Sequence, residues 1–290
     1  MNSNYTIAID AMGGDFGPPA TVPAAALALA QMPDLRFLMF GDESKITPLL
    51  AARPALKAAS SVHHTDRVIA SDEKPASALR SGRNSSMRLA IDAVKDGRAG
   101  GVVSAGNTGA LMATAKMVLK CLPGIHRPAI ASVFPTQRGE TAVLDLGANI
   151  SCDAEILVQF AVLGAVYARA VKGIAQPTVA ILNVGSEYMK GNDQVRGAAA
   201  ILSHVEFPGR FTGFCEGNDI ARGTVDVVVT DGFTGNVALK VAEGVGDLTG
   251  SFIRDAFKSS LLAKLGGMLA YGALKKAKRR MDPRVYNGGM

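Results

Sequence analysis

The chain has 290 residues, of which 48% are hydrophobic, with 32 glycines and no tryptophan. It is therefore long and apolar enough to bury a core, which excludes a disordered or fibrous protein. The net charge of +6 is local, because residues 254–284 hold nine Lys and Arg against two Asp, and the remainder is close to neutral. This indicates one acidic partner or anionic surface, and argues against a protein that is basic throughout for nucleic-acid binding.

The N-terminal sequence MNSNYTIAID lacks a basic region followed by an apolar core, so we expect no secretory signal. The three cysteines, Cys121, Cys152 and Cys215, have neither an even count nor metal-site spacing, which favours a reduced, cytoplasmic setting. The apolar run at residues 156–168 is too short to span a bilayer, and we expect it to form a buried helix.

Apolar runs and helical patterns alternate along the chain. We expect strands at residues 5–9, 35–40, 60–64, 102–103, 129–134, 141–146, 177–182, 211–216 and 225–229. We expect helices at residues 20–31, 45–52 with Ser44 as cap, 75–95, from 110 onward, 154–172 with Asp153 as cap, 193–204 and 237–250. The strands are apolar on both faces, which is typical of parallel βαβ units. The prediction is a single α/β domain over residues 1–290, with three α/β/α layers and a mostly parallel sheet.

Residues 252–283 differ from the rest, because large apolar residues stand there among lysines and arginines. The pattern predicts an amphipathic, basic helical hairpin that is broken at Gly266-Gly267 and ends near Pro283. One interpretation is a helix pair packed on the core with a solvated basic face. The other is an element that lies on a membrane surface, with its cations on lipid phosphates.

Five predicted strands end in turns that combine glycine with Asn or Asp. Ligands of open parallel sheets bind beyond the carboxyl ends of the strands, so the turns predict one polar cleft. The central turn, residues 104–109, leads into a helix whose first N–H groups favour an anion, with Asn107 or Thr108 as cap. Lys190 supplies a cation in another of these turns. Such a site suits phosphate or a developing oxyanion.

Several other chemistries lack the residues that they need. The sequence has no G-x-S-x-G elbow and no G-x-G-x-x-G fingerprint, and its four histidines lie outside the glycine turns. We expect Cys152 to be buried at a helix start rather than catalytic. Asp10, Asp15, Asp145 and Asp231 either hold a divalent metal or cap helices and fix loops; we predict no metal and no cofactor.

Five motifs resemble the PlsX family, the phosphate acyltransferases of bacterial phospholipid synthesis. In chain order they are IDAMGGDFGP at 9–18, SAGNTGAL at 104–111, DLGAN at 145–149, NVGSE at 183–187 with Lys190-Gly191, and TDGFTGNV at 230–237. The resemblance implies transfer of a fatty acyl group from acyl-(acyl carrier protein) to inorganic phosphate. The acyl phosphate would then pass to a membrane glycerol-3-phosphate acyltransferase.

The resemblance also implies a fold similar to isocitrate and isopropylmalate dehydrogenases, and a homodimer that associates peripherally with the membrane from the cytoplasm. The resemblance further implies that family members continue beyond the position of Met290 into a final strand and helix. The expected partners are acyl carrier protein, inorganic phosphate and an anionic membrane surface, with no nucleic acid.

On this basis we expect phosphate at residues 106–109 and 232–236, with Lys190 balancing its charge. Asn107, Asn183 or Asn236 would stabilise the tetrahedral oxyanion, and Asp231 completes the catalytic candidates. The residues assigned to substrate and phosphate binding are Asp10, Gly13, Gly14, Asp15, Ser104, Gly106, Thr108, Gly109, Asp145, Asn149, Gly185, Glu187, Gly232, Phe233 and Thr234. Those assigned to the membrane or carrier-protein surface are Lys264, Leu265, Met268, Leu269, Lys275, Lys276, Lys278, Arg279 and Arg280.

Three other functions share parts of this pattern. A phosphotransacetylase-like enzyme that uses acyl-coenzyme A would have the turns without needing the hairpin. A nicotinamide-dependent dehydrogenase of similar fold would need an adenine pocket and a metal, for which the sequence has no clear residues. The third is a non-enzymatic peripheral membrane regulator.

Overall fold

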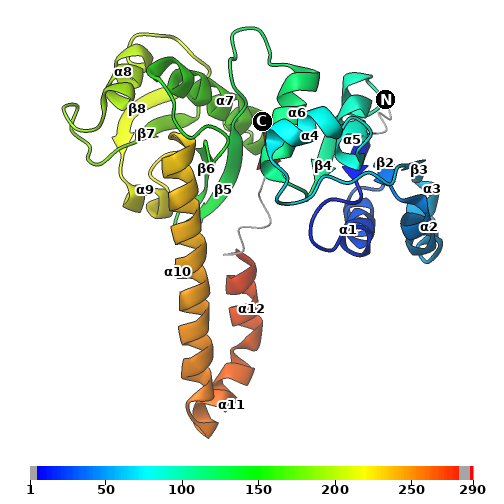
Figure 1. The fold of residues 1–290 in the computed structure, drawn as a ribbon. Helices are drawn as coiled ribbons and strands as arrows, with labels where there is room; N and C mark the ends of the chain where they lie inside the picture. The colour runs from blue at the N-terminus through cyan, green and yellow to red at the C-terminus, as the bar shows by residue number, and fades with distance from the viewer. Residues whose placement is uncertain (1–4, 281–287, 290) are drawn as a thin grey trace. The chain divides into compact units, whose positions relative to one another are not determined.

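The computed structural model describes residues 5–280 and 288–289, with side chains for residues 5–277. It divides into two compact units, unit 1 (Met1–Pro123) and unit 2 (Gly124–Met290), each with its own sheet (Figure 1). The sequence pattern predicts one domain with one sheet instead. Strands and helices alternate in the same way within both units, so the periodicity of the sequence does not mark where one sheet ends and the next begins.

Unit 1 has a four-stranded parallel sheet in the order β3-β2-β1-β4. The strands are β1 (Thr6–Asp10), β2 (Arg36–Gly41), β3 (Ser60–His64) and β4 (Gly101–Ser104). The helices are α1 (Pro18–Gln31), α2 (Glu43–Ala51), α3 (Pro54–Ala58), α4 (Pro75–Ser81), α5 (Ser86–Lys95) and α6 (Thr108–Leu119). These elements confirm the predicted βαβ alternation, with β3 at one edge of the sheet.

Successive residues of β1 point to opposite faces of the sheet, as the pleat requires. Ile9 packs with residues of α1, α2 and α3, whereas Ala8 packs with Ala90 and Ala93 of α5. Helices therefore cover both faces, and unit 1 has the predicted three layers.

Unit 2 has a six-stranded sheet in the order β10-β5-β6-β9-β7-β8. The strands are β5 (Ile130–Thr136), β6 (Gly139–Leu144), β7 (Thr178–Leu182), β8 (Arg210–Cys215), β9 (Val227–Val229) and β10 (Gly288–Gly289). The helices are α7 (Ala154–Lys172), α8 (Asp193–Leu202), α9 (Gly217–Arg222), α10 (Gly232–Lys258), α11 (Leu261–Leu269) and α12 (Tyr271–Arg280). The β6, β9, β7 and β8 pairings are parallel, while β5 is antiparallel to β6 and to β10.

Unit 2 also has three layers. Val227 and Val229 of β9 pack against α7 and α8, whereas Val228 between them packs on the other face, with residues of α9 and α10. Among the described residues, α7 is the one helix long and apolar enough to cross a membrane, yet Phe160 and Ala161 at its centre are fully buried on the sheet. The prediction that residues 156–168 form a buried helix is confirmed.

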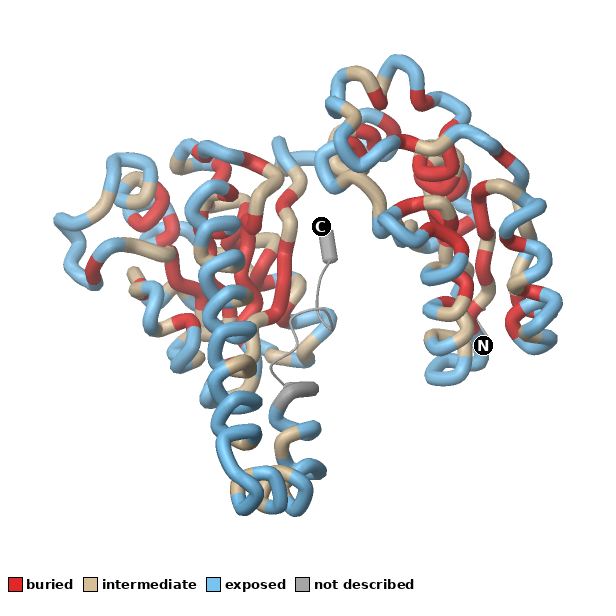
Figure 2. The backbone as a smooth tube through the Cα atoms, turned by 60° about the horizontal axis from the view of Figure 1, so that its bottom comes forward, coloured by how far each residue is buried: buried red, intermediate tan, exposed pale blue. Residues whose placement is uncertain are grey.

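The hairpin begins earlier than the sequence suggests. Helix α10 starts at Gly232 instead of residue 237, and it leads through α11 at the tip to α12, which returns beside it (Figures 1 and 2). The predicted break at Gly266-Gly267 is wrong: both glycines lie inside α11, and an added Cβ on Gly267 would lie 3.0 Å from the ring of Phe257. The last predicted hairpin residues, 281–283, lie outside the described residues.

Two other boundaries in unit 1 differ from the predictions. The helix predicted at 75–95 is two helices, because Ser85 caps α5 by accepting a hydrogen bond from Arg88 N at 3.2 Å. The predicted cap Ser44 lies within α2, and the cap is Asp42, whose carboxylate accepts from Ser44 N at 3.0 Å. In both places several adjacent residues can cap a helix, and the sequence alone does not choose between them.

Candidate functional site

The carboxyl ends of β1 and β4 lie side by side in unit 1, with Asp10 in register with Ser104. The Ser104 hydroxyl donates to Asp10 Oδ2 at 2.7 Å and accepts from Gly106 N at 3.1 Å. Asp10 is almost fully buried. These contacts link the two strand ends, so Asp10 and Ser104 support the 104–109 turn. The Gly106 amide already donates to Ser104 and is therefore not available to a ligand.

The glycines of the first turn bring the two backbones into contact. An added Cβ on Gly13 would lie 2.8 Å from Gly106 N, and one on Gly14 would lie 3.1 Å from the Ala105 carbonyl oxygen. Gly14 also has φ +83°, which favours glycine. Asp15, next in the chain, is exposed on the outer side of this turn.

Asn107 caps α6, as predicted, with its Oδ1 accepting from Ala110 N at 3.0 Å. Its Nδ2 donates to the carbonyls of Ala70, Ser71 and Glu73 at 2.8–3.3 Å. Both ends of the carboxamide are thus engaged, and Asn107 holds the loop of residues 70–73. Thr108 and Gly109 of the first helical turn are exposed.

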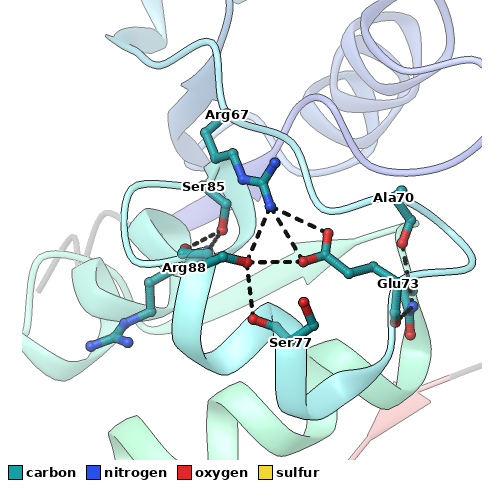
Figure 3. A network of polar contacts seen from close by, with 9 residues as sticks. Arg67, Ala70, Glu73, Ser77, Ser85 and Arg88 are labelled. Atoms are coloured by element: carbon teal, nitrogen blue, oxygen red, sulfur yellow. Dashed lines mark hydrogen bonds and ion pairs between the residues drawn. The ribbon is translucent and has the colours of Figure 1, made fainter.

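The loop that Asn107 holds is further fixed by a polar network that the sequence analysis did not identify (Figure 3). Arg67 Nη2 lies 3.3 Å from Glu73 Oε1 and 3.3 Å from the Ser81 hydroxyl, and that hydroxyl donates to Glu73 Oε1 at 3.1 Å. The network ties this loop to α4 and makes the loop beside the 104–109 turn a fixed wall of unit 1.

In unit 2, Asp145 follows β6 and is completely buried. Its Oδ1 accepts from the amides of Ile130, Gly147 and Ala148 at 2.9–3.2 Å, and its Oδ2 accepts from Asn149 N at 2.7 Å and Asn149 Nδ2 at 2.9 Å. Five donors saturate the carboxylate. Asp145 therefore shapes the 145–149 loop and has no free lone pair for substrate.

The first turn of α10 packs directly on that loop. Gly232 N donates to the Asn149 carbonyl at 2.7 Å, and an added Cβ on Gly235 would overlap the Asp145 carbonyl oxygen. Asp231 caps the helix, accepting from Thr234 N at 2.8 Å and from the Thr234 hydroxyl at 2.9 Å. Residues 232–236, expected as a turn before a helix, are thus the helix start itself.

The turn after β7 carries Lys190. Its ammonium lies 2.8 Å from Glu187 Oε1, and the two side chains fold over the buried Gly185, where a Cβ would lie 2.5 Å from Lys190 Cδ. The hydrogen bond and charge of Glu187 raise the pKa of Lys190, and Lys190 in turn lowers the pKa of Glu187. The predicted cation is therefore present and half-exposed, but it is paired.

This edge also has an apolar side, of which the sequence analysis assigned Phe233 to the site and missed the other residues. Ile150 and Val184 are 68% and 78% exposed, Met189 is 87% exposed, and Phe233 is 61% exposed. Ile150 lies in the loop after β6, Val184 and Met189 lie in the loop after β7, and Phe233 lies in the first turn of α10, which follows β9. These three strands are neighbours in the sheet. Large apolar residues in otherwise polar strand-end turns were the signal available in the sequence.

Cys152 is buried near the start of α7, as expected. Burial, with the nearby charges of Asp145 and Asp231, raises its pKa to about 11, so the thiol is not activated as a nucleophile. Within the described part of the chain, no three His, Cys, Asp or Glu side chains gather as metal ligands. Asp10 and Asp15 lie in unit 1, and Asp145 and Asp231 in unit 2, each group in its own turns.

The tip of the hairpin is strongly exposed. Leu261 and Leu269 are 84% and 83% exposed, and Leu265 and Met268 of the same helix are also exposed. Lys264, Lys275 and Lys276 are exposed around them. The side chains of Lys278, Arg279 and Arg280 lie outside the described residues.

The chain is similar to known proteins over its whole length. A family model described as "Fatty acid synthesis protein" matches residues 5–290. The phosphate acyltransferase of Rhodospirillum centenum is 59% identical over 290 residues, covering 100% of this chain and 82% of the relative. That of Rhodospirillum rubrum is 56% identical, covering 100% and 83%.

Solved structures share the fold at low identity. A phosphotransacetylase from Staphylococcus aureus, EutD, superposes with a TM-score of 0.61 at 19% identity, covering 85% of this chain and 83% of that one. A phosphotransacetylase from Streptococcus pyogenes gives 0.59 at 20% identity, covering 84% and 82%. At such identities the likeness establishes the α/β fold alone.

Proposed function

Because this chain belongs to the PlsX family of phosphate acyltransferases, we propose that it transfers a fatty acyl group from acyl-(acyl carrier protein) to inorganic phosphate and releases acyl phosphate. The observation that carries this proposal is the carboxyl edge of the unit 2 sheet. There the paired cation Lys190 and the start of α10 lie among exposed apolar side chains. An anion and an alkyl chain are the two substrates that such an edge suits.

The start of α10 offers phosphate one amide. Gly232 N, Thr234 N and Gly235 N donate to the Asn149 carbonyl, the Asp231 carboxylate and the Asp231 carbonyl, respectively. Of these first four amides, that of Phe233 is left with no partner within the described residues. The helix dipole adds partial positive charge at the same place. Phosphate at the Phe233 amide would also come near the exposed Phe233 side chain.

Lys190 would balance the phosphate charge by leaving Glu187 and pairing with phosphate. Phosphate carries more negative charge than the Glu187 carboxylate and accepts more hydrogen bonds, and half of the lysine side chain is exposed to solvent. Glu187 therefore holds the ammonium in place until phosphate takes it.

Two asparagines remain as oxyanion donors. Asn183 Nδ2 donates to the Lys190 carbonyl at 3.1 Å, and Asn236 Nδ2 donates to the Leu146 carbonyl at 3.1 Å. Each amide nitrogen has two hydrogens, so one N–H of each is left for the tetrahedral oxygen. Asn107, whose nitrogen donates to three carbonyls, is the weaker candidate.

The reaction needs little acid or base catalysis. Phosphate is already an anionic nucleophile, so the protein has mainly to place one phosphate oxygen against the thioester carbonyl carbon. The new O–C bond forms as the carbonyl oxygen gains charge, which the amide donors stabilise. The C–S bond then breaks, and the sulfur leaves as a thiolate. A thiol like that of cysteine has a pKa of about 8.5, so it leaves without a strong acid.

We propose that the hairpin brings the enzyme to an anionic membrane surface, where the downstream glycerol-3-phosphate acyltransferase takes acyl phosphate. The exposed leucines of α11 suit the acyl boundary, and Lys264, Lys275 and Lys276 suit lipid phosphates. Acidic acyl carrier protein is the alternative partner of the same lysines. Binding to anionic vesicles that weakens with salt supports the membrane, and salt-insensitive binding to neutral vesicles contradicts it.

We propose that the working form is a homodimer. Val237, Val241, Val245, Leu248 and Phe252 are spaced by three or four residues, so they form one exposed apolar stripe along α10. A second copy of this stripe would cover it. Sedimentation of Val241→Ser with Val245→Ser should then show monomers where the unmodified chain shows dimers, and a dimer that survives both changes argues against this interface.

The test of the reaction compares two acyl donors. We expect acyl phosphate from long-chain acyl-(acyl carrier protein), saturable in phosphate, and little from acyl-coenzyme A. Activity with coenzyme A alone would assign the chain to the phosphotransacetylase alternative. In Lys190→Ala the KM for phosphate should rise about tenfold or more, since a charge-assisted hydrogen bond is lost. Lys240→Ala, which removes a lysine from a similar pair with Glu243 on α10, is the matched control.

A further inference from the structure

Unit 1 contains a cavity, partly open to solvent, that the proposed reaction does not use. It measures about 510 Å³ and lies between α1 and α3, with Ala26, Leu29 and Ala30 on one side and Pro54 and Ala55 on the other. Helix α1 leads into β2 and α3 leads into β3, so the cavity lies near the amino ends of these strands. The glycine turns of unit 1 lie at the opposite, carboxyl edge of the same sheet.

Small side chains create this space. Ala26, Leu29, Ala30 and Pro33 recur at the spacing of one helix face, and alanines also line the facing side of α3. The floor is closed by Leu56, which is 1% exposed. The volume lies within the range of about 300–1,000 Å³ that is usual for small-molecule sites, and the walls are mostly apolar.

Two arginines line the same cavity. Arg36 Nη1 donates to the carbonyls of Leu35 at 2.7 Å and Pro33 at 3.3 Å, and Arg53 Nη1 donates to the Leu49 carbonyl at 2.9 Å. No carboxylate lies within 4 Å of either guanidinium among the residues whose side chains are described. Backbone carbonyls thus orient both groups through one nitrogen and leave their charges uncompensated.

A neighbouring hollow brings another arginine close to these two. It shares Arg36, Ala58 and Ala59 with the cavity and adds Arg98 and His63. Among the residues whose side chains are described, the acidic partner there is Asp96, whose carboxylate is 3.8 Å from Arg98. An apolar space with unpaired arginines at its wall is complementary to a molecule with an alkyl chain and one anionic end.

We infer that this cavity binds a medium-chain fatty carboxylate, with the alkyl chain between α1 and α3 and the carboxylate on Arg36 and Arg53. Since Nη1 of each guanidinium is already used, the edge formed by Nε and Nη2 is the one left to bind the ligand. That edge matches the two oxygens of a planar carboxylate. The site is separate from the acyl-transfer edge of unit 2 and goes beyond the proposed function.

The experiment is calorimetric titration of the whole chain with decanoate below its micelle concentration. We expect saturable binding that weakens about tenfold or more in Arg36→Gln and in Arg53→Gln, because each loses a charge-assisted pair. Lys57→Gln, which removes an exposed positive charge from the same helix as Ala55 without altering the cavity wall, should bind as the unmodified chain does. Decanol, which has the same chain without the charge, should bind at least about tenfold more weakly.

A further variant tests whether lost binding reflects unfolding, because Arg36 also donates to the carbonyls of Pro33 and Leu35 in the segment after α1. Ala30→Glu places a carboxylate at the exposed rim of the cavity, and it should weaken decanoate binding while thermal unfolding stays unchanged. Equal binding by Lys57→Gln and Arg53→Gln, equal binding of decanol, or tighter binding of decyl phosphate than of decanoate would overturn the inference. Loss of binding in Met189→Ser would place decanoate at the unit 2 edge, which overturns this site and leaves the proposed reaction standing.

Discussion

Helices α7 and α10 are both long helices of unit 2 that carry large apolar residues, and their surroundings are opposite. In α7, Phe160, Ala161, Ala165 and Ala168 are fully buried against the sheet. In the 27 residues of α10, only Gly232 and Gly235 are buried, and Figure 2 shows the remainder as exposed or intermediate. Large apolar residues alone therefore do not make a helix part of the core. What decides is whether the helix has a sheet face to cover.

The difference also explains how α10 is held. Its contacts with the rest of unit 2 are concentrated in the first turn, where Asp231, Gly232 and Gly235 meet the 145–149 loop. The outer part is held by its own helical hydrogen bonds and by α11. Long helices are seldom stable without packing, so the exposed stripe on α10 needs a partner surface.

The largest expected effect is in α7. Phe160→Ala should lower the free energy of unfolding by about 3–5 kcal/mol, because it removes a fully buried ring and leaves a cavity. Urea unfolding followed by circular dichroism measures it. Val166→Ala on the same helix is the control, since Val166 is exposed and should change little. Equal losses in the two variants would show that α7 is not the core helix.

The first turn of α10 should be the region where a substitution has the next largest effect on stability. Gly235→Ala places a methyl group on the Asp145 carbonyl oxygen, and such overpacking costs about 1–3 kcal/mol or more. Because the 145–149 loop moves with it, acyl transfer should also fall. Unchanged stability and activity would mean that the first turn of α10 is not packed on this loop.

At the start of α7 we expect a smaller effect, which appears in the alkaline pH dependence of stability. Burial raises the pKa of Cys152 from 9.0 to about 11. The folded state holds its proton more tightly, so this contribution is fully present below pH 9 and is lost as pH rises toward 11. Urea midpoints of Cys152→Ala should therefore fall less between pH 8 and pH 10.5 than those of the unmodified chain. Identical slopes would contradict the burial of the thiol.

The smallest expected effect is a gain in stability, in the part of α10 beyond its first turn. Nothing lies within 4 Å of a Cβ added to Gly246, so Gly246→Ala should stabilise the helix by about 0.5–1 kcal/mol through higher helix propensity. Thermal unfolding of Gly246→Ala and Gly235→Ala measures the two opposite changes in stability on one helix. Destabilisation by Gly246→Ala would reveal a close contact at this position in the assembled protein.

Much of the local structure follows from the sequence. Helix starts such as Asn107 and Asp153 are set by contacts within three residues, and both caps are as predicted. Strand positions follow from short apolar runs. These features depend on neighbours along the chain, so the sequence alone locates them, although it does not choose between adjacent cap residues such as Asp42 and Ser44.

The roles of individual site residues depended on contacts between distant segments. Asp145 is saturated by Ile130 and by its own loop, Asn107 holds residues 70–73, and Asn236 donates to Leu146, 90 residues away. The sequence marks all three as polar residues in glycine turns and does not show which donors are already used. The division into two sheets and the exposure of α10 were likewise decided only by the tertiary structure, because hydrophobic burial and hydrogen-bond saturation depend on which segments meet in space.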